Sequence, residues 1–297
     1  RRRVSVSVPS PKLMSQDSHE GKDCEGAHTH SYVLRHDELG PGGYFTPSVL
    51  LGVLQEAAID GSAARGFPMS YYRREGAFWM LRRITFRYER PLRYGDALEV
   101  TTWVSRVGKT SPTREYRIDS ASGGECIARA RTYWVYMDMA TGKSKEIPDD
   151  LRQGFAPTGE PLQSVLEVPS GPLLPGRNAK SQTRKVTLSD VDGAGHAKCC
   201  RYVSWLEDLI GSVSAEAGGR PGATSFGSFD LQLLSATMTG DRVRLLAQPD
   251  DVWRVDLSTN EGQVVARAAL WPCAVNPTRT EFLDLDVGLR ERLSADP

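Results

Sequence analysis

The chain has 297 residues, of which 25% are charged and 39% hydrophobic, and its 37 acidic side chains balance its 37 basic ones. This length suits one large domain or two ordinary ones, each with its own core. The charge balance argues against a disordered chain and against a polyanion-binding surface, so nucleic acid is not an expected partner. The longest apolar stretch, around residues 48–58, is too short to cross a bilayer, so no membrane partner is expected either.

Residues 1–30 are polar, begin with three arginines and lack the apolar core of a secretory signal. We expect a disordered leader there, with a remnant of a targeting peptide as the alternative. The five cysteines show no CxxC spacing, which argues against a disulfide framework and a structural zinc site. The expected compartment is therefore reducing: the cytoplasm, or a plastid if the leader is a transit-peptide remnant.

A helix is predicted early in a first domain that spans residues 31–150. Thr46 can cap the helix and Pro47 suits its first position, and the apolar residues from Val49 to Ala58 recur at helical spacing. Gly61 and Gly66 offer stops. The apolar stripe is broad, which predicts a mostly buried helix.

Strands are predicted after this helix, because the hydrophobic period shifts towards two. They cover residues 83–88, 98–107, 113–118 and 126–138. Gly-containing turns near residues 95, 108 and 123 allow antiparallel neighbours. The first domain is thus predicted to be one long helix against an antiparallel sheet.

A proline-rich stretch with little periodicity follows and is interpreted as a linker over residues 151–183. The second domain, residues 184–280, then repeats the first, with a helix around residues 202–210 and strands at 229–237, 242–247, 252–258 and 263–274. A tail covers residues 281–297. The repeat is visible in sequence, since residues 37–43 align without a gap with 190–196, and 95–100 with 240–245. The predicted fold class is α+β, with two tandem copies of an antiparallel sheet wrapped around a central helix.

Several short motifs carry a family resemblance. In the first domain they include Leu54-Gln55-Glu56-Ala57, Gly95-Asp96 and Ile147-Pro148, and in the second Asp190-Val191-Asp192, Gly195-His196, Tyr202 and Trp205. With these motifs the chain resembles the plant and bacterial acyl-ACP thioesterases, closely over residues 32–150 and in a more diverged form over 184–275. The resemblance implies a tandem hotdog fold and the release of fatty acids from acyl carrier protein.

The resemblance also implies a site. In that family the chemistry is attributed to a loop before the second central helix, with Asp, Asn and His at alternate positions, and to a Glu on a following strand. Asp192 and His196 match the Asp and the His. Ala194 stands at the Asn position and Thr237 near the Glu position, so half of the expected groups differ in type.

Asp192 and His196 are therefore the candidate catalytic residues. Asp192 could take a proton from the attacking water or attack the carbonyl itself, and its structural alternative is a helix cap or Asx turn. His196 could orient Asp192 or polarise the carbonyl, or be a polar residue at the helix start. Gly193 and Gly195 give the loop backbone freedom, and N–H groups at the helix start could receive the oxyanion.

Three further residues are secondary candidates. Glu56 is expected mid-helix among apolar neighbours, where its pKa would be raised, as an acid or base or as a hydrogen-bonded residue between the halves. Cys199 could pair with His196, although free cysteines are more often simply buried. Thr237 is a candidate because it lies near the Glu position. The expected walls of an acyl tunnel are Leu50, Leu54, Ala58, Trp79 and Trp103.

Two hypotheses of function follow. The first is an acyl-thioester hydrolase that releases a fatty or polyketide chain from acyl carrier protein or CoA. The second is a non-hydrolytic hotdog protein that binds, dehydrates or cyclises a carrier-bound acyl or polyketide intermediate, which the differences at Ala194 and Thr237 favour. No cofactor and no metal are expected, and the chain is expected to be a monomer with a pseudo-dimer core or a homodimer.

Overall fold

A computed structural model describes residues 26–40, 43–162, 171–216 and 224–274. The predicted tail, residues 281–297, and nearly all of the predicted leader lie outside these ranges. The helical elements of the first half are η2 (His36–Glu38), α1 (Pro47–Ala64), α2 (Met69–Arg74) and α3 (Asp149–Gly154). Its strands are β1 (His28–Val33), β2 (Ala77–Tyr88), β3 (Ala97–Val107), β4 (Pro112–Ser120) and β5 (Cys126–Asp138).

The second half contains the helical elements η3 (Leu188–Asp190) and α4 (Cys199–Glu216). Its strands are β6 (Lys180–Lys185), β7 (Thr224–Leu233), β8 (Arg242–Gln248), β9 (Trp253–Thr259) and β10 (Val264–Ala274). Strand β1 begins inside the predicted leader, and β6 begins inside the predicted linker. Strand β7 ends before Thr237, contrary to the predicted strand 229–237, because residues 238–241 form a turn in which the Met238 N–H donates to the Asp241 carboxylate.

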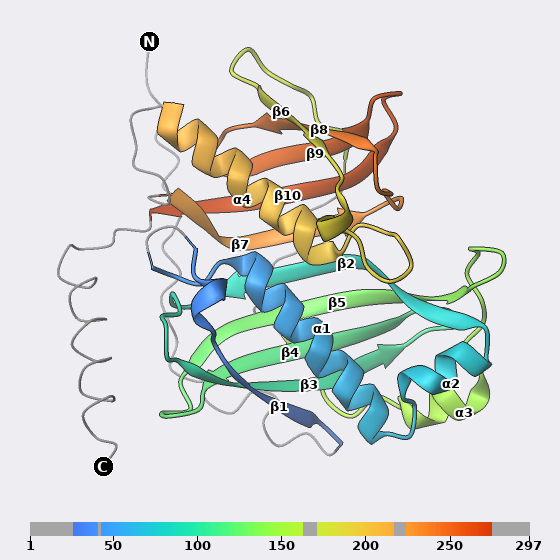
Figure 1. Cartoon of the computed structure of the whole chain (residues 1–297). Helices are drawn as coiled ribbons and strands as arrows, with labels where there is room; N and C mark the ends of the chain where they lie inside the picture. Colours follow the sequence, from blue (N-terminus) through green and yellow to red (C-terminus); the bar gives the residue numbers. More distant parts are fainter. Residues whose placement is uncertain (1–25, 41–42, 163–170, 217–223, 275–297) are drawn as a thin grey trace, which may run out of the picture.

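One antiparallel sheet joins the two halves (Figure 1). Its strand order is β1-β3-β4-β5-β2-β7-β10-β9-β8-β6, so the second half repeats the order of the first in reverse about the β2–β7 junction. In that junction, Arg83 pairs with Gln232 and Arg87 with Ser228. The arrangement is the predicted tandem hotdog, in which the two copies form a pseudo-dimer with a continuous sheet.

A buried ion pair crosses the junction. Asp230 on β7 is only 2% exposed, and its carboxylate accepts hydrogen bonds from Arg83 Nε at 2.9 Å and Arg83 Nη2 at 2.5 Å on β2. This two-point contact fixes the register of the two strands, because sliding β7 by one residue would turn Asp230 to the opposite face.

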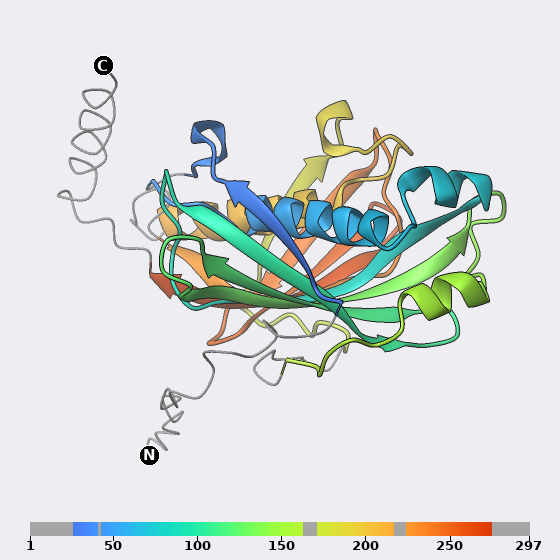
Figure 2. The ribbon, with the colours of Figure 1, turned by 90° about the horizontal axis from the view of Figure 1, so that it is seen from below.

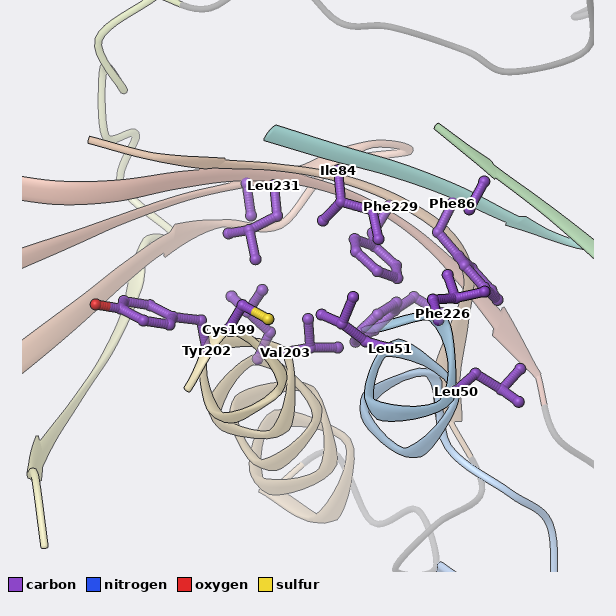
Figure 3. Packing of buried hydrophobic residues seen from close by; sticks show 14 of the residues in the cluster. Leu50, Leu51, Ile84, Phe86, Cys199, Tyr202, Val203, Phe226, Phe229 and Leu231 are labelled. Atoms are coloured by element: carbon purple, nitrogen blue, oxygen red, sulfur yellow. The ribbon is translucent and has the colours of Figure 1, made fainter. Parts of the chain in front are cut away.

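Helices α1 and α4 lie side by side on one face of the sheet (Figures 1 and 2). Their inward faces share one apolar core with the strands, and Figure 3 shows Leu51 of α1 and Val203 of α4 pointing towards Leu231 and Phe229 of β7. The broad apolar stripe predicted for the first helix is confirmed. Gly61 lies within the helix, not at its end, since α1 runs on to Ala64.

The described residues of the loops before the two helices correspond in their hydrogen bonds and backbone angles. The Gly40 N–H donates to the Tyr44 carbonyl, and in the second half the Asp192 N–H donates to the His196 carbonyl. Each loop then places a glycine at positive φ, Gly43 at 79° and Gly195 at 82°. The structure thus matches Gly40 with Asp192 and Tyr44 with His196, one residue away from the alignment predicted from sequence.

The segment after α3 covers the face of the sheet opposite α1 (Figure 2). Trp103 Nε1 donates to the Glu160 carbonyl at 3.0 Å, and Arg131 Nη2 donates to the Leu162 carbonyl at 2.7 Å. Strand β4 is therefore buried along its whole length, with α1 on one side and this segment on the other. The described start of the predicted linker, residues 151–162, is therefore part of the first half's structure.

Helices α2 and α3 belong to the first half and have no counterpart among the described residues of the second. They enclose an aromatic cluster at the C-terminal end of α1, formed by Phe67, Tyr71, Tyr72, Trp79, Tyr136 and Phe155. This cluster closes the far end of the first half's interior. Within the described ranges, no helix is both long and apolar enough to span a membrane.

Candidate active site

The candidate site is the loop between η3 and α4. Its ends are joined by a bridge between Val191 and Ala197, and the Ala197 N–H donates to the Thr237 carbonyl at 2.8 Å. At its tip the Gly195 N–H donates to the Asp192 carbonyl at 3.0 Å, which closes a tight turn. The positive φ of Gly195 favours glycine at this position, as the sequence predicted.

The carboxylate of Asp192 is exposed and is held by its own loop. Its Oδ1 accepts hydrogen bonds from the Ala194 N–H at 2.9 Å and the His196 N–H at 3.1 Å. Asp192 therefore has the Asx-turn role that was its structural alternative. Its Oδ2 has no hydrogen-bond partner in the described part of the chain, so a fixed carboxylate still presents one free oxygen.

His196 meets Asp192 through its backbone and not through its ring. Its main chain bridges to Met238, and its imidazole makes no hydrogen bond to any described residue. The half-buried ring is thus available to a ligand, whereas the geometry shows no side-chain contact that would orient the carboxylate.

Oxyanion donors can be assigned from the free backbone N–H groups. The N–H groups of Asp192, Ala194, Gly195 and His196 are all occupied within the loop. The Gly193 N–H donates to no described residue, and open space surrounds its Cα. Gly193, together with the first turn of α4 and its positive dipole end, can therefore stabilise a negative oxygen, whereas the Gly195 N–H cannot.

Cys199 starts α4 and faces the apolar core, as Figure 3 shows. Burial, and to a lesser extent the nearby Cys200 and Asp192, raise the pKa of the Cys199 thiol. Burial likewise raises the pKa of Cys200. Since the thiolate is the reactive form, these positions disfavour a cysteine nucleophile. Cys199 belongs to the apolar core that the two helices share with the sheet.

Thr237, the residue near the family's Glu position, is fully buried. Its hydroxyl forms a hydrogen bond with the hydroxyl of Tyr202 on α4, at 2.8 Å. The pair joins the end of the β7–β8 connection to the helix. This contact gives Thr237 a structural role, and its hydroxyl is not free for a ligand.

Glu56 does not lie among apolar neighbours as predicted. It is exposed on the outer side of α1, because it falls one position away from the buried Ala57.

The carboxylate between the halves is instead Glu207 of α4. Its Oε1 accepts from the Ser48 N–H at 2.8 Å and its Oε2 from the Ser48 hydroxyl at 2.7 Å. Glu207 thus caps α1, a role predicted for Thr46, whose hydroxyl bonds Ser48 Oγ at 2.9 Å. Burial raises the pKa of Glu207 to about 7.

Four of the five predicted tunnel residues lie on the helix side of the sheet or on α1 itself. Leu50 and Leu54 are fully buried, Ala58 is half-buried against the core, and Trp79 belongs to the aromatic cluster. Trp103 does not lie where the prediction of a tunnel wall placed it. It faces the other side of the sheet, where it packs on Leu162 beneath the segment after α3, since β3 turns alternate side chains to opposite faces. In the described parts of the chain, no cluster of three or more His, Cys, Asp or Glu side chains could hold a metal ion.

Comparison with known proteins shows which family the chain is similar to. Residues 25–155 match the family model of the acyl-ACP thioesterase N-terminal domain. Among curated proteins, a chloroplastic palmitoyl-acyl carrier protein thioesterase of Cuphea hookeriana is 27% identical over 187 residues, which cover 59% of this chain and 45% of that protein. The chain thus spans about half the length of the curated relatives it matches.

Solved structures extend the likeness to both halves. An acyl-ACP thioesterase from Bacteroides thetaiotaomicron superposes with a TM-score of 0.72 at 20% identity, covering 84% of this chain and 98% of the other. The 12:0-ACP thioesterase from Umbellularia californica gives a TM-score of 0.71 at 19% identity, with the same coverage. The chain therefore resembles the acyl-ACP thioesterases, with the sequence of their N-terminal domain in its first half and a tandem hotdog fold throughout.

Proposed function

We propose that the protein hydrolyses acyl thioesters carried by acyl carrier protein, with CoA thioesters as the alternative substrate class. The observation that carries this proposal is the fixed, half-free carboxylate of Asp192 at the start of α4, in a chain whose first half matches the acyl-ACP thioesterase N-terminal domain. The corresponding position of the first half is Gly40, so the chemistry is assigned to the second half alone.

In the proposed reaction, Oδ2 of Asp192 accepts a proton from a water molecule as that water attacks the thioester carbonyl. The carbonyl oxygen becomes negative and is stabilised by the Gly193 N–H and the start of α4. The carbon–sulfur bond then breaks, and the proton passes to the leaving thiolate, which gives the free acid and the thiol of the carrier. The protonated carboxyl of Asp192 donates that proton, while the imidazole of His196, which makes no hydrogen bond to the described residues, can polarise the carbonyl.

A second function is kept because the loop departs from the family pattern. Ala194 supplies no amide side chain, and the Thr237 hydroxyl is held by Tyr202. A site with these differences could instead dehydrate or cyclise a polyketide chain that stays attached to its carrier, using Asp192 and His196 as base and acid.

Thiol release separates the two functions. The full chain is incubated with panels of acyl-ACP and acyl-CoA thioesters, and free thiol is followed over time. We expect release from acyl-ACP, and Asp192→Asn should slow it by about 100-fold or more, because the amide keeps the Asx turn but cannot take a proton.

Asp251→Asn is the matched control, since Asp251 is an exposed residue between β8 and β9, and it should leave the rate unchanged. Intact thioesters with a dehydrated or cyclised chain, detected by mass spectrometry, would contradict hydrolysis and support the second function. Release unaffected by Asp192→Asn would overturn the assigned role while leaving hydrolysis in place.

The compartment and assembly belong to the same proposal. Cys126, Cys199 and Cys200 are free thiols, which fits a reducing compartment such as the cytoplasm or a plastid stroma. We propose that the pseudo-dimer acts as a monomer, because the β2–β7 junction already supplies each hotdog copy with a partner.

A further inference from the structure

The first half contains a hollow of about 530 Å³ at the C-terminal end of α1. It is lined by Gly61, Ala64 and Arg65 of α1, by the chain entering β1, and by Pro157 and Thr158 of the segment after α3. The Thr158 hydroxyl is buried and has no hydrogen-bond partner among the described residues. The hollow therefore offers polar groups that the fold itself leaves unused.

A buried guanidinium lies next to Gly61, one of the residues that line this hollow. Arg114 of β4 is 7% exposed, and its Nη1 donates to Thr102 Oγ1 at 3.2 Å. In the described ranges this is the one hydrogen bond of the guanidinium, which has no ion pair. Its other close neighbour is the ring of Phe155, whose centroid lies 5.6 Å away. Burial lowers the pKa of Arg114, but a guanidinium stays charged in proteins.

Gly61 opens the hollow onto this charge. A Cβ atom at Gly61 would lie 3.4 Å from Arg114 Nη1 and 3.3 Å from the Cβ of His28, so any side chain there would fill the space between them. Arg65 adds a second guanidinium at the rim, where it donates to the carbonyls of Gly154 and Gly26. The hollow is thus positive on two sides.

No described carboxylate neutralises this charge. Asp60, the neighbouring acid on α1, is held by His30 Nδ1 at 2.6 Å. The groups that influence the pKa of Arg114 are burial, the phenols of Tyr116 and Tyr72, and Arg65. Tyr72 in turn is hydrogen-bonded to Ser62 at 2.6 Å. An isolated buried cation is costly, and an anion that entered the hollow would offset that cost.

One apolar core connects the candidate active site with the strand of the guanidinium. Cys199, which begins α4 directly after the loop of Asp192, and Tyr116 of β4 belong to the same cluster of buried side chains. Tyr116 and Arg114 are two residues apart on the same strand and face the same helix. An acyl chain whose thioester rests at Asp192 would therefore run under the C-terminal half of α1 with its far end at Arg114.

The second half provides an internal control for this feature. The strand registers place Trp253 where the first half has Arg114, Ala247 where it has Thr102, and Leu270 where it has Thr132. The helix position of Gly61 corresponds to Val213. The fold is thus stable with an apolar filling at these places, so the polar set around Arg114 is not required by the architecture.

We propose that Arg114 binds a carboxylate at the far end of the acyl chain, so that the preferred substrate is a thioester of a chain with an acidic terminus. The proposal deepens the proposed function and rests on it. A carboxylate can accept two N–H bonds from one guanidinium, and the pair removes the isolated charge. A terminal methyl group would leave that charge buried and unpaired.

The direct test compares two acyl-ACP series of equal chain lengths, one ending in a methyl group and one in a carboxylate. With the wild-type chain we expect kcat/KM to be about 10-fold or more in favour of the carboxylate series at the best length, since charge-assisted hydrogen bonds are worth more than about 1.4 kcal/mol when desolvated. Equal or better turnover of the methyl series would overturn the proposal.

Two variants sharpen the test. Arg114→Leu should remove the preference without unfolding the chain, because replacing a buried charge with an apolar residue is often neutral. Gly61→Ala should narrow the hollow and weaken the carboxylate series, while its helix gains propensity. Val213→Ala, at the matching position of α4, is the control and should leave the kcat/KM ratio of the two series unchanged.

A binding arm separates this proposal from hydrolysis. Calorimetry with the free dicarboxylic acid and the free monocarboxylic acid needs no turnover. Tighter binding of the diacid to the wild-type chain, lost in Arg114→Leu, would support the acidic-terminus site even if no thioester were cleaved. Hydrolysis together with equal binding of the two acids would overturn the site and leave the proposed function standing.

Discussion

The two halves share one fold but differ in what their interiors and loops contain. Where the loop of the second half has Asp192, the loop of the first has Gly40. Where the first half buries Arg114 under its helix, the second has Trp253 at the corresponding strand position. The candidate catalytic carboxylate and the buried cation are therefore on opposite copies.

Because the two hotdog copies are fused in one chain, their sequences can differ. A dimer of identical copies would carry both the carboxylate and the buried cation in each copy, whereas here each copy carries one of them. The capping contact is also present in one direction only. Glu207 of α4 caps α1, whereas the matching position on α1 is Gln55. The two halves thus differ at these positions, while their strand orders remain mirror images of each other.

The largest expected effect comes from making the two loops alike. Asp192→Gly gives the second loop the residue of the first and should lower kcat/KM by about 100-fold or more. Gly40→Asp, which gives the first loop the residue of the second, should not restore activity in that background. Thiol release measures both, and full activity of Asp192→Gly would contradict the assignment of chemistry to the second half.

The junction between the halves should be the next most sensitive feature. Asp230→Ala leaves Arg83 half-buried without its carboxylate, and we expect the free energy of unfolding to fall by about 3 kcal/mol. Urea denaturation followed by circular dichroism measures the change. Asp208→Ala, which removes an exposed partner of Arg184, is the control and should cost well under about 1 kcal/mol. Equal effects would show that the junction does not depend on the buried pair.

Glu207 should make stability depend on pH. Its pKa in the fold is about 7, above its value of 4.5 in an unfolded chain, because burial disfavours the ionised form. Its contribution is therefore complete below about pH 4.5 and is lost as the pH rises to about 7, by about 3 kcal/mol.

Glu207→Gln keeps an oxygen that accepts from the Ser48 N–H but cannot ionise. The variant should therefore lose less stability than the wild type between acidic and neutral pH. Urea midpoints at several pH values measure this, and parallel curves for the two proteins would show that Glu207 does not titrate in this range.

The smallest expected effect is an increase in activity. Ala194 is exposed and has an ordinary negative φ, so Ala194→Asn fits the loop and supplies the amide that the family pattern has there. We expect kcat/KM for thiol release to rise by roughly 3 to 10-fold, since a positioned polar group would help orient the water. A lower rate with unchanged stability would mean that the loop works by a different arrangement.

The fold was predictable because its signals are local and occur twice. The helical stripe from Val49 to Ala58 and the alternation in the strands fix the elements, and the repeat fixes the architecture. The loop was predictable for the same reason, as the Asp-x-x-Gly turn depends on residues that are adjacent in sequence. The one-residue error in aligning the two loops arose because the matching residues, Gly40 and Asp192, differ in type.

The remaining features depend on contacts between distant segments. Trp103 was placed in the tunnel because its strand was known but the face it presents was not. Glu56 was chosen over Glu207 because sequence alone does not show which carboxylate lies between the helices. Arg114 lies in a strand of alternating pattern, where a charged residue is expected to face solvent. The structure shows instead that β4 is buried along its whole length.

The most direct test of the division between the halves is a paired measurement on Asp192→Asn. Affinity for a non-hydrolysable thioether analogue of the best acyl-ACP should match that of the wild type, while single-turnover thiol release from the true thioester should be lost. Loss of affinity with intact chemistry, or thiol release at the wild-type rate, would contradict the account.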